Sequence, residues 1–288
     1  MSYKSGMDAN DENGRAQFSA QLRLAVAFLT RLPVEHAPDD EGPHPESEFP
    51  ESGETPPDLA ATMWLFPLVG FGIGGAGALA LGVLAWGGVP APVAATLAIG
   101  IMIWLTGALH EDGLSDIADG FGGGGDRDRK LEIMRDSRLG AYGTVTLAVV
   151  IVAKIAALAT IAAHDIGAAA GALIAAAVWS RALIAPTMRW LDPARDDGLG
   201  ATAGKPSEGD SWKGLGLAVL LVLLVLVTPA GFGVVTVLIA GGLGAFAVGM
   251  IAFRQIGGYT GDVLGAAVAI AETAALVAAS AAISGSLS

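Results

Sequence analysis

The chain alternates long apolar runs with short polar connections. An α-helix rises about 1.5 Å per residue, so a run of about 20 apolar residues can cross roughly 30 Å of bilayer hydrocarbon. Seven runs fit this description, with approximate limits 62–86, 91–109, 144–163, 167–187, 215–229, 232–253 and 263–284. Buried helices of a soluble protein would not repeat with so few charges. The pattern predicts an all-α fold, a polytopic transmembrane helical bundle of about seven spans.

The N-terminal part has a different pattern. Between about residues 16 and 33, apolar side chains recur at helical spacing and arginines flank the stripe, which predicts an amphipathic helix at the membrane surface. Residues 35–58 hold nine acids, six prolines and no Lys or Arg, a composition typical of a solvated linker. We therefore divide the chain into an acidic N-terminal extension, 1–58, and an integral membrane catalytic domain, 59–288.

Composition supports a membrane protein and narrows its chemistry. Hydrophobic residues make up 53% of the chain and charged residues 15%, with a mean hydropathy of +0.58. These values lie outside the usual range for a soluble domain. The absence of cysteine excludes disulfides and thiolate metal sites, so any metal must rest mainly on carboxylates. The net charge of -12 argues against a nucleic-acid partner, which would require basic patches.

The basic residues predict the topology. They lie in the N-terminal segment, in the loops after the second and fourth runs, and just after the sixth run. The connections at about 87–90, 164–166 and 229–231 hold none. By the positive-inside rule the basic segments are cytoplasmic and the C-terminus lies outside.

Most of the candidate chemistry is in residues 106–143, TGALHEDGLSDIADGFGGGGDRDRKLEIMRDSRLGAYG. Asp112, Asp116 and Asp119 are spaced i, i+4, i+7, which places them on one face if the second span continues as helix. Such a row of like charges is tolerated when a divalent cation neutralises it, and oxygen ligands favour Mg²⁺, Mn²⁺ or Ca²⁺. Glu111 points to another face, and a metal role for it is left open. Asp262, at the start of the last run, is a further candidate metal or substrate ligand.

The same segment holds groups suited to phosphate. Gly122 and Gly123 belong to a four-glycine run that can bring backbone N–H groups close to a ligand or serve only as a flexible joint. Cations after this run can reach anionic oxygens; they include Lys130, Arg135 and Arg138. Carboxylates for metal beside cations for phosphate are typical of phosphoryl transfer. His110 is a candidate general base or phosphate donor, or only a local hydrogen-bonding group.

Three charged residues fall within the predicted spans or at their ends. Intramembrane charges are costly and usually face the protein interior or a cavity. Arg181 is predicted to contact phosphate, with snorkelling to the interface as the alternative. For Lys154 a structural ion pair, with Glu272 as the candidate partner, is weighed equally with a functional role.

Six blocks together resemble the adenosylcobinamide-GDP ribazoletransferase family, the cobalamin (5'-phosphate) synthases. They occur in family order across nearly the whole chain after the extension: FLTRLPV (28–34), FPLVG (66–70), GALHEDGLSDIADGFGGG (107–124), RLGAYG (138–143), WSRALIAP (179–186) and GGYTGDVLGA (257–266). The resemblance implies a Mg²⁺-dependent, multi-pass enzyme of the bacterial inner membrane. It would join adenosylcobinamide-GDP to alpha-ribazole or its 5'-phosphate and release GMP.

This resemblance sets the expected roles. Asp112, Asp116 and Asp119 would hold Mg²⁺ against the pyrophosphate, and Asp116 or Asp119 would accept the ribose hydroxyl proton. Arginines would offset the phosphate charge, namely Arg135, Arg138 and Arg181, and the substrate-binding set also includes Arg31, Lys130, Gly122 and Gly123. A homo-oligomer, or association with other late cobalamin enzymes, is left open.

Two other functions remain as alternatives. In DIADG, residues 116–120, the chain reproduces the opening of the CDP-alcohol phosphotransferase motif, but it lacks that motif's Ala-Arg pair and its final two aspartates. An ion-coupled transporter would use the acids to bind its coupling ion. The expected pair of similar halves with interrupted helices is not evident in the sequence.

Overall fold

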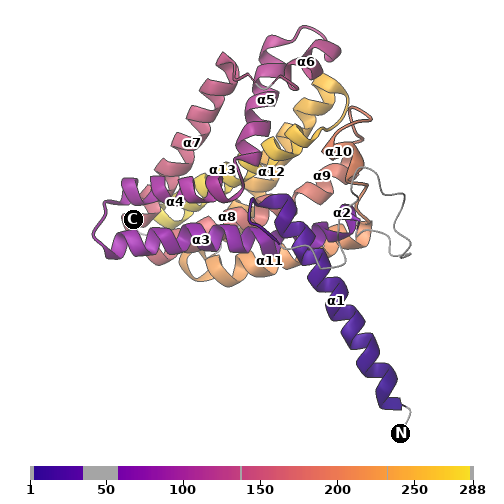
Figure 1. The fold of residues 1–288 in the computed structure, drawn as a ribbon. Helices are drawn as coiled ribbons and strands as arrows, with labels where there is room; N and C mark the ends of the chain where they lie inside the picture. The colour runs from indigo at the N-terminus through magenta and orange to yellow at the C-terminus, as the bar shows by residue number, and fades with distance from the viewer. Residues whose placement is uncertain (1–2, 35–57, 137, 232, 286–288) are drawn as a thin grey trace.

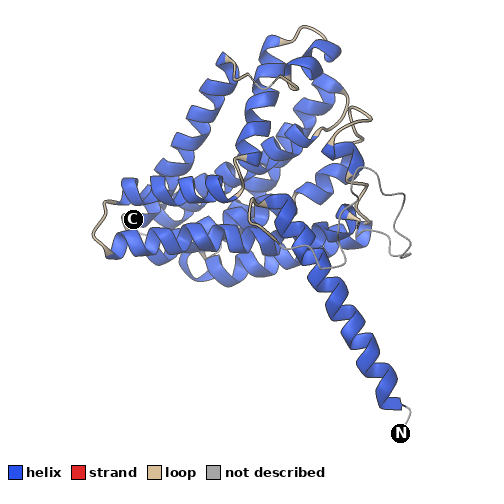
Figure 2. Ribbon diagram, in the orientation of Figure 1, coloured by secondary structure: helices blue, strands red, loops and turns tan. Residues whose placement is uncertain are grey.

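The protein is a bundle of helices, here seen in a computed structural model that describes residues 3–34, 58–136, 138–231 and 233–285 (Figures 1 and 2). Within these ranges the only β-type pairing is an isolated bridge between Pro193 and Tyr259. The predicted all-α class is confirmed. The helices are α1 (Tyr3–Leu29), α2 (Leu59–Thr62), η1 (Met63–Leu65), α3 (Phe66–Trp86), α4 (Ala91–Leu105), α5 (Leu109–Gly123), α6 (Arg127–Ile133), α7 (Ala141–Ala162), α8 (Ile166–Ala182), α9 (Ile184–Trp190), α10 (Leu199–Thr202), α11 (Glu208–Ala230), α12 (Gly233–Ile256) and α13 (Gly261–Gly285).

The number of spans agrees with the prediction of about seven. Within the described ranges, six helical segments are long and apolar enough to cross a membrane, and a seventh is added if the bent pair α4 and α5 counts as one span. The outer faces of these helices expose large apolar side chains, as Val145, Val149 and Val152 do on α7. Residues at this spacing lie on one side of a helix, where lipid can cover them.

The second span departs from its expected course. From the sequence we predicted a span at 91–109 and considered that it could continue as helix into the acidic segment. In the structure the chain bends by 88° between α4 and α5. Gly107 and Ala108 make the bend with φ values of +63° and +61°. A positive φ is uncommon for alanine, so the surrounding contacts must hold this turn. The acidic segment is therefore a separate helix, α5.

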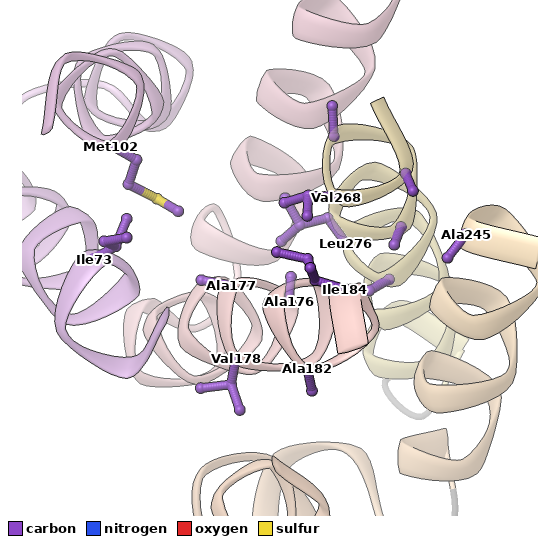
Figure 3. Close-up of a cluster of buried hydrophobic side chains, with 14 of the residues drawn as sticks. Ile73, Met102, Ala176, Ala177, Val178, Ala182, Ile184, Ala245, Val268 and Leu276 are labelled. Atoms are coloured by element: carbon purple, nitrogen blue, oxygen red, sulfur yellow. The ribbon is translucent and has the colours of Figure 1, made fainter. Parts of the chain in front are cut away.

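Helix α8 is the centre of the bundle. It is the most enclosed of the candidate spans, and α3, α7, α11 and α13 pack around it. Figure 3 shows the small side chains Ala176 and Ala177 of α8 among larger ones from neighbouring helices. Close packing depends on glycine: a Cβ at Gly70 of α3 would lie 2.5 Å from the Ala177 carbonyl oxygen, and one at Gly74 2.7 Å from the Ile174 Cα. Small residues thus let α3 and α8 approach closely, as is usual in lipid.

Helix α1 begins at Tyr3, well before the predicted start near residue 16, and its N-terminal part projects from the bundle (Figure 1). Its C-terminal turns pack against the bundle through the buried Ala25 and Leu29. Just after it, the Arg31 guanidinium lies over the Trp104 ring, 5.6 Å from the ring centroid. The acidic segment 35–57 of the predicted extension lies outside the described residues.

Candidate active site

The site forms where α5 crosses the first turns of α13. A Cβ at Gly113 would lie 2.7 Å from the Asp262 carbonyl oxygen, and one at Gly265 would lie 3.1 Å from that of Leu109. Both positions need glycine because the two backbones touch there. The crossing brings Asp112 of α5 and Asp262 of α13 to the same pocket, although they are far apart in sequence.

The pocket has a volume of about 180 Å³ and lies between the end of α1, α5, α9 and α13. Four polar side chains line it: His110, Asp112, Arg195 and Asp262. The rest of the lining is apolar or glycine, namely Phe28, Leu29, Met63, Leu109, Gly113, Ile184, Met188, Gly200, Ala203, Gly261, Leu264 and Gly265. A few converging polar groups in an apolar wall are typical of a ligand site.

A second, wider hollow of about 290 Å³ lies between α1, α2 and α11, away from the aspartates. Its charged residues, Asp210 and Lys213, already form an ion pair at 2.9 Å. The smaller pocket at the α5–α13 crossing is therefore the better candidate, because it gathers the acids and a basic side chain.

The three aspartates of α5 have different surroundings. Asp112 lines the pocket. Asp116, one turn on, is half-buried and close enough to Asp112, Asp119 and Asp262 to experience their repulsion. Among the described residues, no three acidic or histidine side chains are grouped closely enough to hold a metal ion by themselves. A three-aspartate metal site remains a prediction, and the contacts of Asp119 give that residue a second role.

Asp119 caps the N-terminus of α7. Its Oδ2 accepts the Gly140 N–H at 2.8 Å and its Oδ1 accepts the Gly143 N–H at 2.9 Å. The first N–H groups of a helix lack partners within the helix, and a carboxylate also complements the positive end of the helix dipole. The motif RLGAYG thus supplies the two N–H groups that fasten α7 to α5.

Arg195 was not among the site residues predicted from the sequence. It lies in the connection after α9, and its Nη2 is 3.4 Å from Asp262 Oδ2. The connection is fastened to the segment before α13, because Ala194 donates its N–H to the Tyr259 carbonyl oxygen at 2.8 Å and Tyr259 donates to that of Asp192 at 2.9 Å. Neither segment contains a sequence motif that marks Arg195 as a site residue. The sequence therefore gives no signal that Arg195 lies close to Asp262.

Next to the pocket is a buried network of charges. Lys154 of α7 lies 3.4 Å from Glu111 of α5 and 2.8 Å from Glu272 of α13, and Arg181 of α8 also pairs with Glu272. The proposed Lys154–Glu272 pair is confirmed. The structure places Arg181 in this network and not in the pocket lining, and its contact with phosphate stays a prediction. His110 is buried, and its Nε2 lacks a hydrogen-bond partner within the described part of the chain.

The predicted phosphate cations after α5 lie outside the pocket. Arg135 pairs with Asp197 at 2.6 Å. Arg138 donates hydrogen bonds to the Asp136 carboxylate, which hold the pKa of that carboxylate below its usual range. Lys130 is half-buried on α6. Like Arg31, these residues are absent from the described pocket lining, and their substrate contacts remain predictions.

The four-glycine run is partly helical. Gly122 and Gly123 form the last turn of α5, and the helix ends at the cap residue Gly124. A Cβ at Gly122 would lie 2.6 Å from the Tyr142 ring, so this glycine allows α5 to pack on the start of α7. A backbone role in ligand binding for the two glycines stays a prediction.

Comparison with known proteins identifies the family. The family model described as cobalamin-5-phosphate synthase matches residues 21–280. Adenosylcobinamide-GDP ribazoletransferase from Azorhizobium caulinodans is 41% identical over 90% of this chain and 94% of its own length. The enzymes of the same name from Mesorhizobium japonicum and Bradyrhizobium diazoefficiens are each 40% identical, over 93% and 86% of this chain and 95% and 88% of their own lengths. No solved structure matches. The chain is therefore a member of the cobalamin-5-phosphate synthase family.

Proposed function

We propose that the protein is an adenosylcobinamide-GDP ribazoletransferase of the bacterial inner membrane. It joins adenosylcobinamide-GDP to alpha-ribazole or its 5'-phosphate and releases GMP. The observation that carries this proposal, beside the family, is the pocket that gathers Asp112, Asp262, His110 and Arg195 at the end of an apolar bundle. Acids that can hold a divalent cation, beside a basic side chain, suit a diphosphate better than they suit a neutral ligand.

The size of the pocket indicates which part of the substrate it holds. A volume of about 180 Å³ lies below the roughly 300–1,000 Å³ that is typical of a pocket enclosing a drug-sized ligand. We therefore assign the pocket to the diphosphate and the attacking hydroxyl, and not to a corrin ring or a whole nucleotide. The larger groups must therefore extend beyond the pocket.

The donor set fits Mg²⁺. Asp112 and Asp116 are one helical turn apart on α5, and their oxygens are the ligands that this ion prefers. Mg²⁺ commonly takes only one or two carboxylates together with phosphate oxygens and water, so a cluster of three protein ligands is not required. When bound, the ion would offset the mutual repulsion of the acids and the charge of the diphosphate.

The residues of the chain have separate tasks in the transfer. The 3'-hydroxyl oxygen of the ribose forms a bond to the phosphorus attached to the cobinamide side chain, the bond from that phosphorus to the bridging oxygen breaks, and GMP leaves with that oxygen. We assign Asp116 as the acceptor of the hydroxyl proton, because it is half-buried and lies one helical turn from Asp112, which lines the pocket. The buried Nε2 of His110 has no hydrogen-bond partner among the described residues, and we assign it as a donor to a phosphate oxygen.

We place the pocket at the cytoplasmic side of the membrane. In Figure 1, α6 and α10 lie at the upper right of the bundle, and the α3–α4 connection and the end of α13 lie at its left. Helix α6 carries Arg127, Arg129 and Lys130 and the α3–α4 connection has no Lys or Arg, as the positive-inside rule requires if the α6 side is cytoplasmic. Substrates made in the cytoplasm would then reach the site without crossing the bilayer.

The test uses purified protein in lipid with adenosylcobinamide-GDP, alpha-ribazole and Mg²⁺. We expect GMP and the joined corrinoid in equal amounts, and neither product when one substrate is left out. The 5'-phosphate of alpha-ribazole, compared in parallel, identifies the preferred acceptor. No GMP under any divalent metal would refute the proposal, and uptake of unchanged substrate into sealed liposomes would favour the transporter alternative.

A further inference from the structure

Arg195 lies in a connecting segment that is held by hydrogen bonds on both sides of this residue. The backbone on its N-terminal side pairs with Tyr259 through two hydrogen bonds of 2.8 and 2.9 Å, and the Tyr259 hydroxyl donates to the Gly200 carbonyl oxygen at 3.2 Å on its other side. Arg127 of α6 also donates to the Ala194 carbonyl oxygen. These contacts fix the segment against the start of α13.

The side chain of Arg195 is only partly satisfied by the protein. Its Nη2 lies 3.4 Å from Asp262 Oδ2 and its Nε lies 3.9 Å from Asp197 Oδ1, while the buried Nη1 has no hydrogen-bond partner among the described residues. A buried guanidinium nitrogen without a partner is costly, and a ligand oxygen would remove that cost. Arg195 also lines the pocket that holds Asp112.

The Asp262 carboxylate is held by contacts from two neighbouring side chains. The hydroxyl of Thr260 donates to its Oδ2 at 3.1 Å, and the same oxygen faces Arg195. A carboxylate in this position orients a guanidinium by charge-assisted contact. Asp112 lines the same pocket, and no such basic partner is present for it among the described residues.

We propose that Arg195 binds a phosphate oxygen of the GDP-linked substrate through Nη1, and that Asp262 is the positioning residue that holds this guanidinium. The proposal rests on the proposed function for the identity of the substrate. It divides the pocket into a metal side formed by α5 and an anion side formed by the segment after α9 and the start of α13. It also assigns to Arg195 the phosphate contact that the sequence suggested for Arg181, which pairs with Glu272 instead.

The first experiment compares Arg195→Gln, Arg195→Lys and the charge-matched control Arg254→Gln. Arg254 is exposed in the last turn of α12 and lies outside the described pocket lining. We expect Arg195→Gln to raise KM for adenosylcobinamide-GDP about tenfold or more, because a charge-assisted contact is lost. Arg195→Lys should recover part of the loss, KM for alpha-ribazole should stay within twofold, and the control should match the unmodified protein. A KM for adenosylcobinamide-GDP within twofold in Arg195→Gln would overturn the proposal.

The second experiment separates positioning from metal binding at Asp262. In Asp262→Asn, a positioning role predicts a higher KM for adenosylcobinamide-GDP with an unchanged Mg²⁺ concentration for half-maximal activity. A clear rise in that Mg²⁺ concentration at saturating substrate would overturn the assignment and make Asp262 a metal ligand.

A direct binding measurement keeps the inference independent of turnover. Inorganic pyrophosphate, titrated with Mg²⁺ present onto the detergent-solubilised full chain, should bind Arg195→Gln at least tenfold more weakly than the unmodified protein or Arg254→Gln. If the unmodified protein releases no GMP, the proposed function fails, while this titration still decides the anion site. Equal binding by all three proteins would refute the anion site even if GMP is released.

Discussion

Replacing Glu272 with glutamine should destabilise the protein strongly by leaving a charge unpaired. Glu272 neutralises Lys154 and Arg181, and with Glu111 the network holds two positive and two negative groups. All four side chains are 10% exposed or less, so water cannot replace the lost carboxylate. Breaking a buried pair by removing one partner costs about 3–5 kcal/mol. At roughly 2–4 °C per kcal/mol for a chain of this order of size, the melting temperature should fall by roughly 6–20 °C.

The control for this prediction restores neutrality. The double variant Glu272→Gln with Lys154→Met leaves Glu111 and Arg181, so the net charge of the network returns to zero. If the cost arises from the unpaired charge, the double variant should melt well above Glu272→Gln alone, because replacing a complete pair is often neutral. Tryptophan fluorescence in detergent, recorded at one scan rate, measures both transitions. The single variant Lys154→Met is measured as well. A fall in the melting temperature of the double variant that equals the added falls of the two single variants would refute the reasoning.

Three further predictions concern the site. Gly113→Ala should lower turnover at least about tenfold, because its Cβ would lie 2.7 Å from the Asp262 carbonyl oxygen and must displace α5. The control Gly72→Ala should leave turnover unchanged, because a Cβ at that position meets nothing within 4 Å. Asp119→Asn should lower the free energy of unfolding by about 0.5–2 kcal/mol, because an amide oxygen replaces only one of its two cap acceptors; an unchanged denaturation midpoint would exclude the cap. Chelation of divalent metal should abolish GMP release, and added Mg²⁺ should restore it; full activity in excess chelator would contradict the metal role.

The sequence predicted the membrane fold because the length and apolar character of each run can be read from the local sequence. It also gave the Lys154–Glu272 pair as one of two equally weighted interpretations, since a buried charge in a bilayer requires a partner, and the structure contains this pair. It placed the aspartate row correctly on one helix but missed the bend before it. Ala108 adopts a positive φ only because tertiary contacts hold it there, and the residue type gives no sign of this.

The same limit applies to the cations of the site. The sequence predicted phosphate contacts for Arg135 and Arg138, which follow the aspartates closely along the chain. The structure shows them paired with Asp197 and Asp136, and their phosphate contacts remain predictions. Arg195 reaches the pocket because backbone hydrogen bonds join its segment to Tyr259, 65 positions away from Ala194. Contacts at that separation depend on the assembled bundle, so local patterns do not reveal them.

The most direct test of the central claim compares turnover by Asp116→Asn with turnover by Asp128→Asn. Asp128 lies nearby on α6, but its side chain is 91% exposed, so the two variants lose the same charge in different surroundings. GMP release should be measured at saturating substrates and Mg²⁺, per mole of folded protein. The account predicts that Asp116→Asn loses at least about a hundredfold in turnover while Asp128→Asn keeps full activity. Full activity in Asp116→Asn would contradict a transfer site built on the carboxylates of α5.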